Sequence, residues 1–382
     1  MGDGADQIRY GFVGVGMMGQ EHVRNVLALP GAVPVAAADP HEPSRSAAAT
    51  IVQEAGDAPM ATYADTSEMV RHESLDALVV STPNHTHRDV LEPLWGTGLH
   101  LLVEKPLCTT VADCLHVRDA AAEHDAVVWV GLEYRYMPPV QRFLSLATDP
   151  ATVGRLHMLS IREHRFPFLV KVGDWNRFNV NTGGTLVEKC CHFFDLMRQT
   201  LPGRPVRVFA SGGQDVNHLD ERYEQGAPDV LDNAFVVVDF DDGSRALLDL
   251  SMFAEGSAYE QELTAVGDAG KVEVRLPGFM EAARGRRAQL VVGSRADDWP
   301  VDVSDLDDDE RVRFQGAHHG ASYLEHLDFC AAIRSGARPS VTVDDGLWSV
   351  AMGAAAHRSI DEGRPVTLDE VGLPADVGGE LS

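Results

Sequence analysis

Short apolar runs alternate with longer helical patterns along the first third of the chain. The runs are apolar throughout, as strands buried on both faces are, and segments with helical spacing lie between them. This alternation is typical of a parallel sheet with crossover helices. The expected strands are Tyr10–Val13, Val33–Ala38, Leu75–Ser81, His100–Val103 and Ala126–Val130, and the expected helices are Gln20–Leu29, Ser44–Glu54, Thr66–His72, Thr86–Gly96 and Val111–Glu123.

The pattern changes from about Met137 onward. Apolar and polar positions now alternate, as in strands with one buried face, and Asp241-Asp242-Gly243 is a hairpin signal between two of them. We therefore expect a large, mostly antiparallel sheet with helices on one face and the other face open. The expected strands are Arg155–Glu163, Val206–Gly212, Asn233–Phe240, Ser244–Phe253, Glu260–Val266 and Gly270–Arg275.

A glycine-rich turn, Gly14-x-Gly16-x-x-Gly19, joins the first strand to the first helix. In a dinucleotide-binding unit the first glycine makes the turn, the second admits a pyrophosphate and the third lets the helix pack on the strand. Asp39 ends the next apolar run, twenty residues after Gly19, where an acid receives the ribose hydroxyls. The alternative is a tight turn with no ligand. The turn and Asp39 together favour a Rossmann cofactor domain.

The predicted fold is thus α/β: an N-terminal Rossmann dinucleotide-binding domain over residues 1–135 and a C-terminal α+β domain with a large open-faced sheet over residues 136–382. A chain of 382 residues is long enough for two cores. Asp39 favours NAD because a carboxylate repels a 2′-phosphate, whereas His41 and Arg45 nearby keep NADP possible. We expect the open sheet faces to bury each other in a homodimer or homotetramer.

Two loops at the carboxyl ends of later strands carry candidate chemistry, because ligands bind at that edge of a parallel sheet. The loop from Ser81 to His87 could touch a nicotinamide ribose, or could be only a turn and a helix cap. In Glu104-Lys105-Pro106, a charged pair follows a buried strand, which is costly without a purpose. The ammonium of Lys105 could stabilise charge on a substrate hydroxyl; the alternative is a surface ion pair.

A third candidate follows Gly183-Gly184 in the second domain. Glu188, His192 and Asp195 fall at i, i+4 and i+7 of a segment with helical spacing that is otherwise apolar, so they form one narrow stripe. The stripe either faces a cleft or is the solvent side of the helix. His192 is the best candidate base because its ordinary pKa lies closest to neutrality.

Composition narrows the function further. There are 58 Asp and Glu against 32 Lys and Arg, a net charge of −26, which argues against nucleic-acid and anionic-membrane partners. The segment Met1–Gln7 lacks a signal-peptide pattern. Five cysteines form no C-x-x-C pair, and Cys190-Cys191-His192 lacks further ligands, so we predict no metal. We expect a soluble cytoplasmic protein.

The glycine turn, the Ser-Thr-Pro-Asn-His-x-His loop (81–87) and Glu104-Lys105-Pro106, in this order and spacing, resemble the glucose–fructose oxidoreductase / inositol dehydrogenase / rhizopine-catabolism (Gfo/Idh/MocA) family. The resemblance continues through Gly131–Pro138 and reaches Val366-x-Leu368, nearly the whole chain. It implies that Lys105 stands in the active site and that its bond to Pro106 is cis. The cofactor contacts it implies are Gly14, Gly16, Met17, Met18, Asp39, Ser81, Thr82, Pro83, Asn84, His87, Glu104, Lys105, Trp175 and Arg177.

The family's second signature, G-G-x-x-x-D-x-x-x-H, implies that the acid and the histidine are catalytic. His192 matches, whereas Glu188 stands in the place of the aspartate, which puts the identity of the substrate in doubt. The resemblance further suggests substrate contacts at Arg135, His164, Asp195 and, more weakly, Tyr323.

The function so implied is an NAD-dependent dehydrogenase that oxidises a secondary hydroxyl of a cyclitol, sugar or glycoside. Lys105, His192 and Glu188 would be catalytic. The acidic balance and Glu188 favour an amino-bearing substrate as a minority reading. Two alternatives stay open: a glycosidase that cycles a bound NAD, and a sensor that binds the dinucleotide without chemistry. The presence of both Lys105 and His192, the residues expected to be catalytic, disfavours the sensor.

Overall fold

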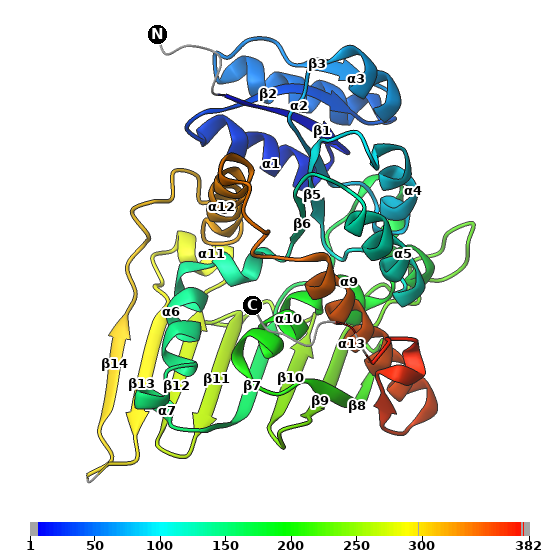
Figure 1. The fold of residues 1–382 in the computed structure, drawn as a ribbon. Helices are drawn as coiled ribbons and strands as arrows, with labels where there is room; N and C mark the ends of the chain where they lie inside the picture. Colours follow the sequence, from blue (N-terminus) through cyan, green and yellow to red (C-terminus); the bar gives the residue numbers. More distant parts are fainter. Residues whose placement is uncertain (1–6, 297, 376, 378–382) are drawn as a thin grey trace. The chain divides into compact units, whose positions relative to one another are not determined.

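The computed structural model describes residues 7–296, 298–375 and 377, and these fall into two compact units (Figure 1). The first unit comprises residues 7–133, 171–175 and 310–347, and the second comprises the remaining described residues. Most of the Met1–Gln7 segment lies outside the described residues. The expected division at residue 135 did not foresee that 310–347 return to the first unit. They do so because α12 (Ala321–Ser335) packs along α1 (Met17–Ala28).

The first unit contains a parallel sheet with the strand order β3-β2-β1-β4-β5-β6, which is the order of dinucleotide-binding folds. Its strands are β1 (Ile8–Val13), β2 (Ala32–Ala38), β3 (Ala61–Tyr63), β4 (Ala77–Val80), β5 (His100–Glu104) and β6 (Val128–Gly131). The five expected strands are confirmed. The sixth, β3, was missed because three residues make no recognisable apolar run.

Four helices of the first unit follow the predicted positions closely, α4 is shorter than expected, and α12 was not predicted. The helices of this unit are α1, α2 (Glu42–Glu54), α3 (Thr66–His72), α4 (His87–Leu91), α5 (Val111–Ala122) and α12. Side chains cap two of them: Asp65 accepts a hydrogen bond from the Glu68 N–H of α3, and Thr110 accepts one from the Asp113 N–H of α5. The helix expected over Thr86–Gly96 is broken instead, with single 3₁₀ turns on either side of α4.

The second unit is built on a nine-stranded sheet in the order β14-β13-β12-β11-β7-β10-β9-β8-β15. Neighbouring strands are antiparallel except β7 and β10, which are parallel, so the mostly antiparallel sheet is confirmed. The strands are β7 (Leu156–His164), β8 (Pro205–Gly213), β9 (Asn233–Phe240), β10 (Arg245–Ser251), β11 (Gln261–Gly267), β12 (Gly270–Leu276), β13 (Gln289–Ser294), β14 (Val301–Asp305) and β15 (Val366–Thr367). The sequence pattern missed the last three.

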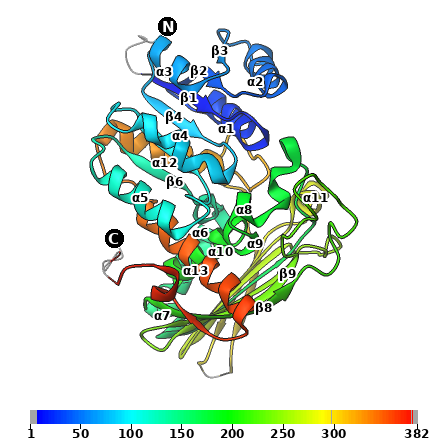
Figure 2. The same ribbon diagram turned by 90° about the vertical axis from the view of Figure 1, so that its right-hand side faces the viewer.

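Helices cover one face of this sheet (Figure 2). They include α6 (Pro138–Ala147), α7 (Pro150–Val153), α8 (Asn179–Thr182), α9 (Thr185–Glu188), α10 (Cys191–Thr200) and α13 (Val343–Glu362), whose first five residues belong to the first unit. The unit also contains α11 (Phe279–Ala283), of which no residue is buried. The opposite face carries exposed apolar side chains; Phe235 is 61% exposed and Met158 54%. The predicted open-faced sheet is therefore confirmed. Within the described part of the chain, no helix is both long and apolar enough to cross a membrane.

Candidate functional site

The glycine turn between β1 and α1 has the geometry of an anion cradle. Gly14 has a φ of +81°, and a Cβ placed on it would lie 2.8 Å from the Ser81 carbonyl oxygen. A Cβ on Gly19 would lie 2.2 Å from the Gly14 oxygen, so both positions require glycine. A Cβ on Gly16, by contrast, would meet no described atom within 4 Å. The start of α1 at Met17 therefore borders open space, which fits a pyrophosphate.

Asp39 is held beside this turn at the carboxyl end of β2. One carboxylate oxygen accepts a hydrogen bond from the Val15 N–H at 2.8 Å, and the other accepts one from the His41 N–H at 2.8 Å. Arg45 donates to the Asp39 carbonyl oxygen. Because a carboxylate has further lone pairs, Asp39 is oriented by its neighbours and can still accept from ribose hydroxyls.

The loop after β4 supports the turn from the other side. Ser81 Oγ donates to the Gly14 carbonyl at 2.7 Å, and Thr86 Oγ1 donates within the loop to Thr82 and Pro83. Asn84 is buried at the base of this loop. The segment is thus a hydrogen-bonded turn that contacts the glycine turn, and its contact with a cofactor stays a prediction.

His87, predicted to contact the cofactor, is fully buried instead. Its Nδ1 lies 3.0 Å from the Pro106 carbonyl oxygen and its Nε2 lies 3.0 Å from the Thr82 carbonyl oxygen. Burial lowers the pKa of His87, although the carbonyl oxygens act in the opposite direction. The imidazole joins the loop after β4 to the loop after β5, and its contact with the cofactor stays a prediction.

Glu104 and Lys105 stand at the end of β5. The Glu104 carboxylate lies 2.9 Å from His22 Nε2 and accepts a hydrogen bond from the Lys105 backbone N–H at 3.0 Å. His22 Nδ1 in turn lies 2.9 Å from His326 Nε2. Burial by itself would lower the pKa of His22, but Glu104 outweighs it and the pKa is raised. Glu104, predicted as a cofactor contact, is therefore engaged beneath Lys105. The Lys105–Pro106 bond is cis, as the resemblance implied.

The two residues predicted for a loop over the cofactor separate. Trp175 belongs to the first unit, where its ring centre lies 6.4 Å from that of His85 in the loop after β4. Arg177 belongs to the second unit, is buried, and donates from Nε to Glu221 at 2.8 Å. Tyr323, suggested as a substrate contact, is buried on α12. Trp175 thus lies beside the loop after β4, and the cofactor and substrate contacts of these three residues stay predictions.

A buried cluster near the end of β6 escaped the sequence analysis. Glu133 lies 3.0 Å from His318 Nδ1 and accepts a hydrogen bond from Ser322 Oγ. Burial raises the pKa of Glu133, but the nearby His318 and Ser322 outweigh it, so that the pKa falls to about 2. These partners lie far apart in sequence, and no local pattern links them.

In the second unit, the stripe of Glu188, His192 and Asp195 is buried, so it is not the solvent side of a helix. The predicted helix is divided by a turn at Lys189 and Cys190 into α9 and α10. All five cysteines of the chain are buried free thiols.

Arg135 and Asp195, both predicted to bind substrate, are brought together and bind each other. Arg135 Nε donates to Asp195 Oδ2 at 2.5 Å and a second guanidinium nitrogen donates to Oδ1, a bidentate pair. The ring of Tyr134 stacks on that of His192, with centres 3.8 Å apart and planes at 6°. Tyr134, which the sequence analysis did not single out, therefore contacts the candidate base directly.

His164, predicted to bind substrate, points the other way. Side chains alternate along β7, so His164 shares the open face with Met158, and it lies 3.1 Å from Asp249 there. Its neighbour Glu163 is on the covered face, where it meets Lys189. Consecutive residues of a strand point to opposite faces of the sheet, and the role of His164 in substrate binding stays a prediction.

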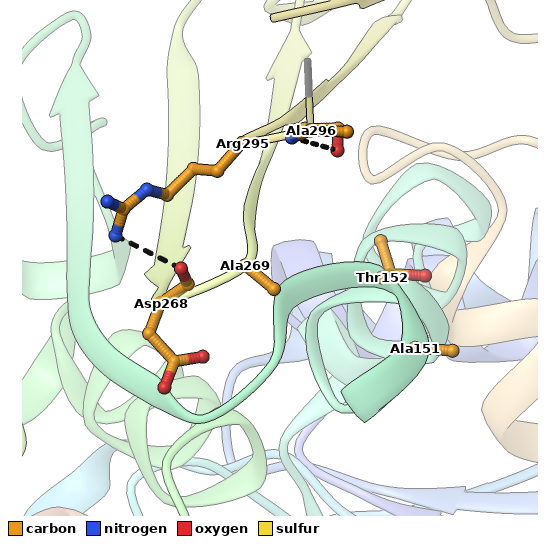
Figure 3. A pocket seen from close by; sticks show the side chains of 7 residues that line it. Ala151, Thr152, Asp268, Ala269, Arg295 and Ala296 are labelled. Atoms are coloured by element: carbon orange, nitrogen blue, oxygen red, sulfur yellow. Dashed lines mark hydrogen bonds between the residues drawn. The ribbon is translucent and has the colours of Figure 1, made fainter.

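A surface pocket of the second unit lies elsewhere (Figure 3). It is bordered by α7, by the turn between β11 and β12, and by the residues after β13. Arg295 donates to the Asp268 carbonyl at 3.1 Å, so its guanidinium is tied to the backbone. The pocket contains no residue of the predicted site, and we do not assign it a ligand.

Comparison with known proteins identifies the family. Residues 8–132 match the model of the oxidoreductase family with an NAD-binding Rossmann fold, and residues 151–368 match its C-terminal alpha/beta domain. The chain belongs to this Gfo/Idh/MocA family, as its motifs indicated. It is therefore an NAD-dependent oxidoreductase, which confirms the predicted enzyme class and cofactor.

Individual relatives cover almost the full chain. Myo-inositol 2-dehydrogenase of Thermotoga maritima is 26% identical, over 95% of this chain and 99% of its own. The scyllo-inositol 2-dehydrogenase (NAD(+)) of Bacillus subtilis is 24% identical, over 95% and 97%. The solved structure of levoglucosan dehydrogenase with NADH and levoglucosan has a TM-score of 0.79 at 20% identity, covering 95% of this chain and 99% of its own, and supports the fold.

Proposed function

We propose that the chain oxidises a secondary hydroxyl group (CH–OH) of a cyclitol or sugar. The proposal is supported by the two inositol dehydrogenase relatives, whose similarity to this chain extends over 95% of its length. It is carried by one structural observation: a carboxylate and an imidazole four residues apart in the chain, Glu188 and His192, are both buried rather than turned to solvent. Burying such groups costs free energy unless partners satisfy them, so their burial is better explained by a functional role than by stability.

The roles follow from the chemistry of each side chain. When bound, NAD supplies C4 of its nicotinamide as the hydride acceptor. His192 takes the proton of the substrate hydroxyl, because an imidazole exchanges protons near neutral pH. The ammonium of Lys105 stabilises the negative charge that develops on that oxygen. Glu188 orients His192 or holds a neighbouring hydroxyl. The alcohol thereby loses a hydride and a proton and becomes a ketone.

The decisive experiment measures NADH absorbance with a panel of inositols, hexoses, amino sugars and glycosides. We expect NADH to form with a cyclitol or a sugar, and His192→Asn and Lys105→Met to lower kcat by about 10²- to 10⁴-fold. The exposed residues His157 and Lys271 offer matched controls, since His157→Asn and Lys271→Met remove the same groups far from the proposed chemistry.

Other outcomes would replace the proposal. Cleavage of a chromogenic glycoside without net NADH would assign the chain to glycosidases that cycle a bound NAD. Binding of NAD with neither reaction would leave a sensor. Full activity of His192→Asn and Lys105→Met would show that other residues carry the proton and the charge.

The finer proposal is that the substrate bears an amino group. It is supported by the net charge of −26 and by a glutamate, Glu188, where the family has aspartate. A cationic substrate gains from a nearby carboxylate. We expect kcat/KM for glucosamine to exceed that for glucose, and Glu188→Gln to reduce this ratio. An unchanged ratio in the variant would remove Glu188 from substrate selection.

We also propose that the open face of the second sheet pairs with a second copy of the chain. Phe235, Met158 and Phe209 are exposed there beside charged pairs such as Arg207–Asp239, and large apolar side chains exposed on one face of a sheet are typical of an interaction surface. Light scattering on the eluted protein should show a dimer or tetramer, and Phe235→Ser should shift it toward the monomer. A monomer in the unaltered protein would refute this proposal.

A further inference from the structure

The second unit buries an ion pair that the proposed reaction does not use. Lys189 Nζ lies 2.8 Å from a carboxylate oxygen of Glu163, and both side chains are almost completely buried. Glu163 also faces Arg165 and Gln261. Removing two charges from water is costly, so a buried pair is weak evidence for a gain in stability. A second contact of the Lys189 ammonium, with Tyr134, indicates the role of this ion pair.

Lys189 also donates a hydrogen bond to the Tyr134 hydroxyl, with Nζ and Oη 2.5 Å apart. The ring of Tyr134 is stacked flat on the imidazole of His192. Phe193 contacts the Tyr134 ring edge-on, with 5.7 Å between the ring centres. One side chain, Tyr134, is thus held at its hydroxyl by the ammonium and at its face by the candidate base.

This arrangement limits the motion of the imidazole. Parallel rings alone can slide and turn relative to one another, because stacking is only weakly directional. A hydrogen bond at the hydroxyl fixes the far end of the tyrosine ring, and the ion pair with Glu163 fixes its donor. The plane of His192 is then set by a chain of contacts that begins in strand β7.

We propose that Lys189 is a positioning residue of the active site, which holds Tyr134 so that its ring keeps the imidazole of His192 oriented for proton transfer. This inference rests on the proposed role of His192 as the base. Lys189 and Tyr134 themselves need not touch the substrate. Proton transfer is sensitive to orientation, and a misplacement of about 1 Å costs up to about a hundredfold in rate.

Two conservative variants test the proposal in the NAD-bound protein. Tyr134→Phe keeps the stacked ring and removes the hydroxyl, whereas Lys189→Met keeps the length of the side chain and removes the charge. We expect each to lower kcat by about tenfold or more while KM for NAD and for the active panel compound stays within about twofold. The double variant should be no slower than the slower single variant, because both remove the same link.

A spectroscopic readout separates positioning from stability. In protein labelled at histidine, the ring proton signal of His192, identified by its loss in His192→Asn, carries the ring-current shift of Tyr134. We expect this signal to broaden or to move in both variants. Lys271→Met, which removes an exposed lysine paired with Glu273, should leave the signal and kcat unchanged.

The outcomes are distinguishable. Unaltered signal and kcat in Tyr134→Phe would overturn the proposal, as would a moved signal with unaltered kcat or additive losses in the double variant. If Lys189→Met does not fold, Tyr134→Phe decides alone. If His192→Asn retains full activity, the proposed function fails, whereas inactive His192→Asn with an unaltered Tyr134→Phe refutes only the positioning role.

Discussion

The two units hold their polar groups by different means. Around the glycine turn of the first unit, side chains bind backbone atoms: Ser81 to the Gly14 carbonyl and Asp39 to the Val15 N–H. Around the stripe of the second unit, side chains bind other charged side chains, as in Arg135 with Asp195. The cofactor edge therefore depends on backbone shape, whereas the covered face of the second sheet depends on matched buried charges. Substitutions should damage the two regions in different ways.

The largest effect should come from removing one charge of the Arg135–Asp195 pair. Asp195→Asn leaves the mostly buried guanidinium without its counter-ion, which costs about 3–5 kcal/mol of unfolding free energy. Urea unfolding measures this loss directly. The double variant Arg135→Met with Asp195→Leu should recover much of it, because no unpaired charge is left. A loss below about 1 kcal/mol in Asp195→Asn would show that the pair behaves like a surface pair.

As the pH falls, the second unit should lose unfolding free energy at a higher pH than the first unit. Burial lowers the pKa of His357 to about 4, and its Nε2 accepts a hydrogen bond from the Leu186 N–H that a proton would displace. Because this pKa lies below the unfolded value of about 6.5, its contribution is complete above that pH and is lost as the pH falls to about 4. Glu133, with a pKa lowered from 4.5 to about 2, loses its contribution only below pH 4.5.

Each of these two groups contributes up to about 3 kcal/mol. Urea unfolding measured across both pH ranges tests whether the His357 contribution is lost at a higher pH than the Glu133 contribution. His357→Gln should flatten the loss between pH 6.5 and 4, and Glu133→Gln should flatten the loss between 4.5 and 2. If His357→Gln leaves the upper window unchanged, another group titrates there.

Two alanine substitutions in the glycine turn separate shape from ligand binding. Gly19→Ala places a Cβ 2.2 Å from the Gly14 oxygen and should cost about 1–3 kcal/mol of stability. Gly16→Ala meets no described atom, so the protein should keep its stability but bind NAD about tenfold more weakly, because the methyl group fills the space beside α1. Calorimetry gives both quantities. Equal NAD affinity in Gly16→Ala would place the pyrophosphate elsewhere.

The same contrast explains what could be predicted from the sequence. Strands β1, β2 and β9 and the glycine turn depend on local patterns, and the chain order of apolar runs is enough to find them. The pairing of Arg135 with Asp195 spans sixty residues, and the contact of Lys189 with Glu163 depends on sheet register. Neither kind of contact can be predicted from a local sequence pattern. Predicted helical spacing placed His192 correctly on a buried stripe.

The face of the sheet and the depth at which a side chain lies could not be predicted from the sequence. His87 and Tyr323 have residue types suited to ligand contact, but packing places both inside the first unit. His164 and Glu163 are consecutive, and only the sheet shows which of them reaches the covered face. Strands β13 and β14 were missed because all their residues except Leu290 are partly or fully exposed, so they lack a clear apolar alternation.

The smallest effect should come from an ion pair on the open face of the second sheet. Arg207 binds Asp239 at 2.6 Å between β8 and β9, and the arginine side chain is 57% exposed. In Arg207→Ala, water can solvate the Asp239 carboxylate in place of the guanidinium. The substitution should therefore change the unfolding free energy by less than about 1 kcal/mol. Urea unfolding of Arg207→Ala beside Asp195→Asn compares an exposed and a buried pair in the same unit. A loss as large as that of Asp195→Asn would mean that the open face is covered in solution, as pairing with a second copy requires.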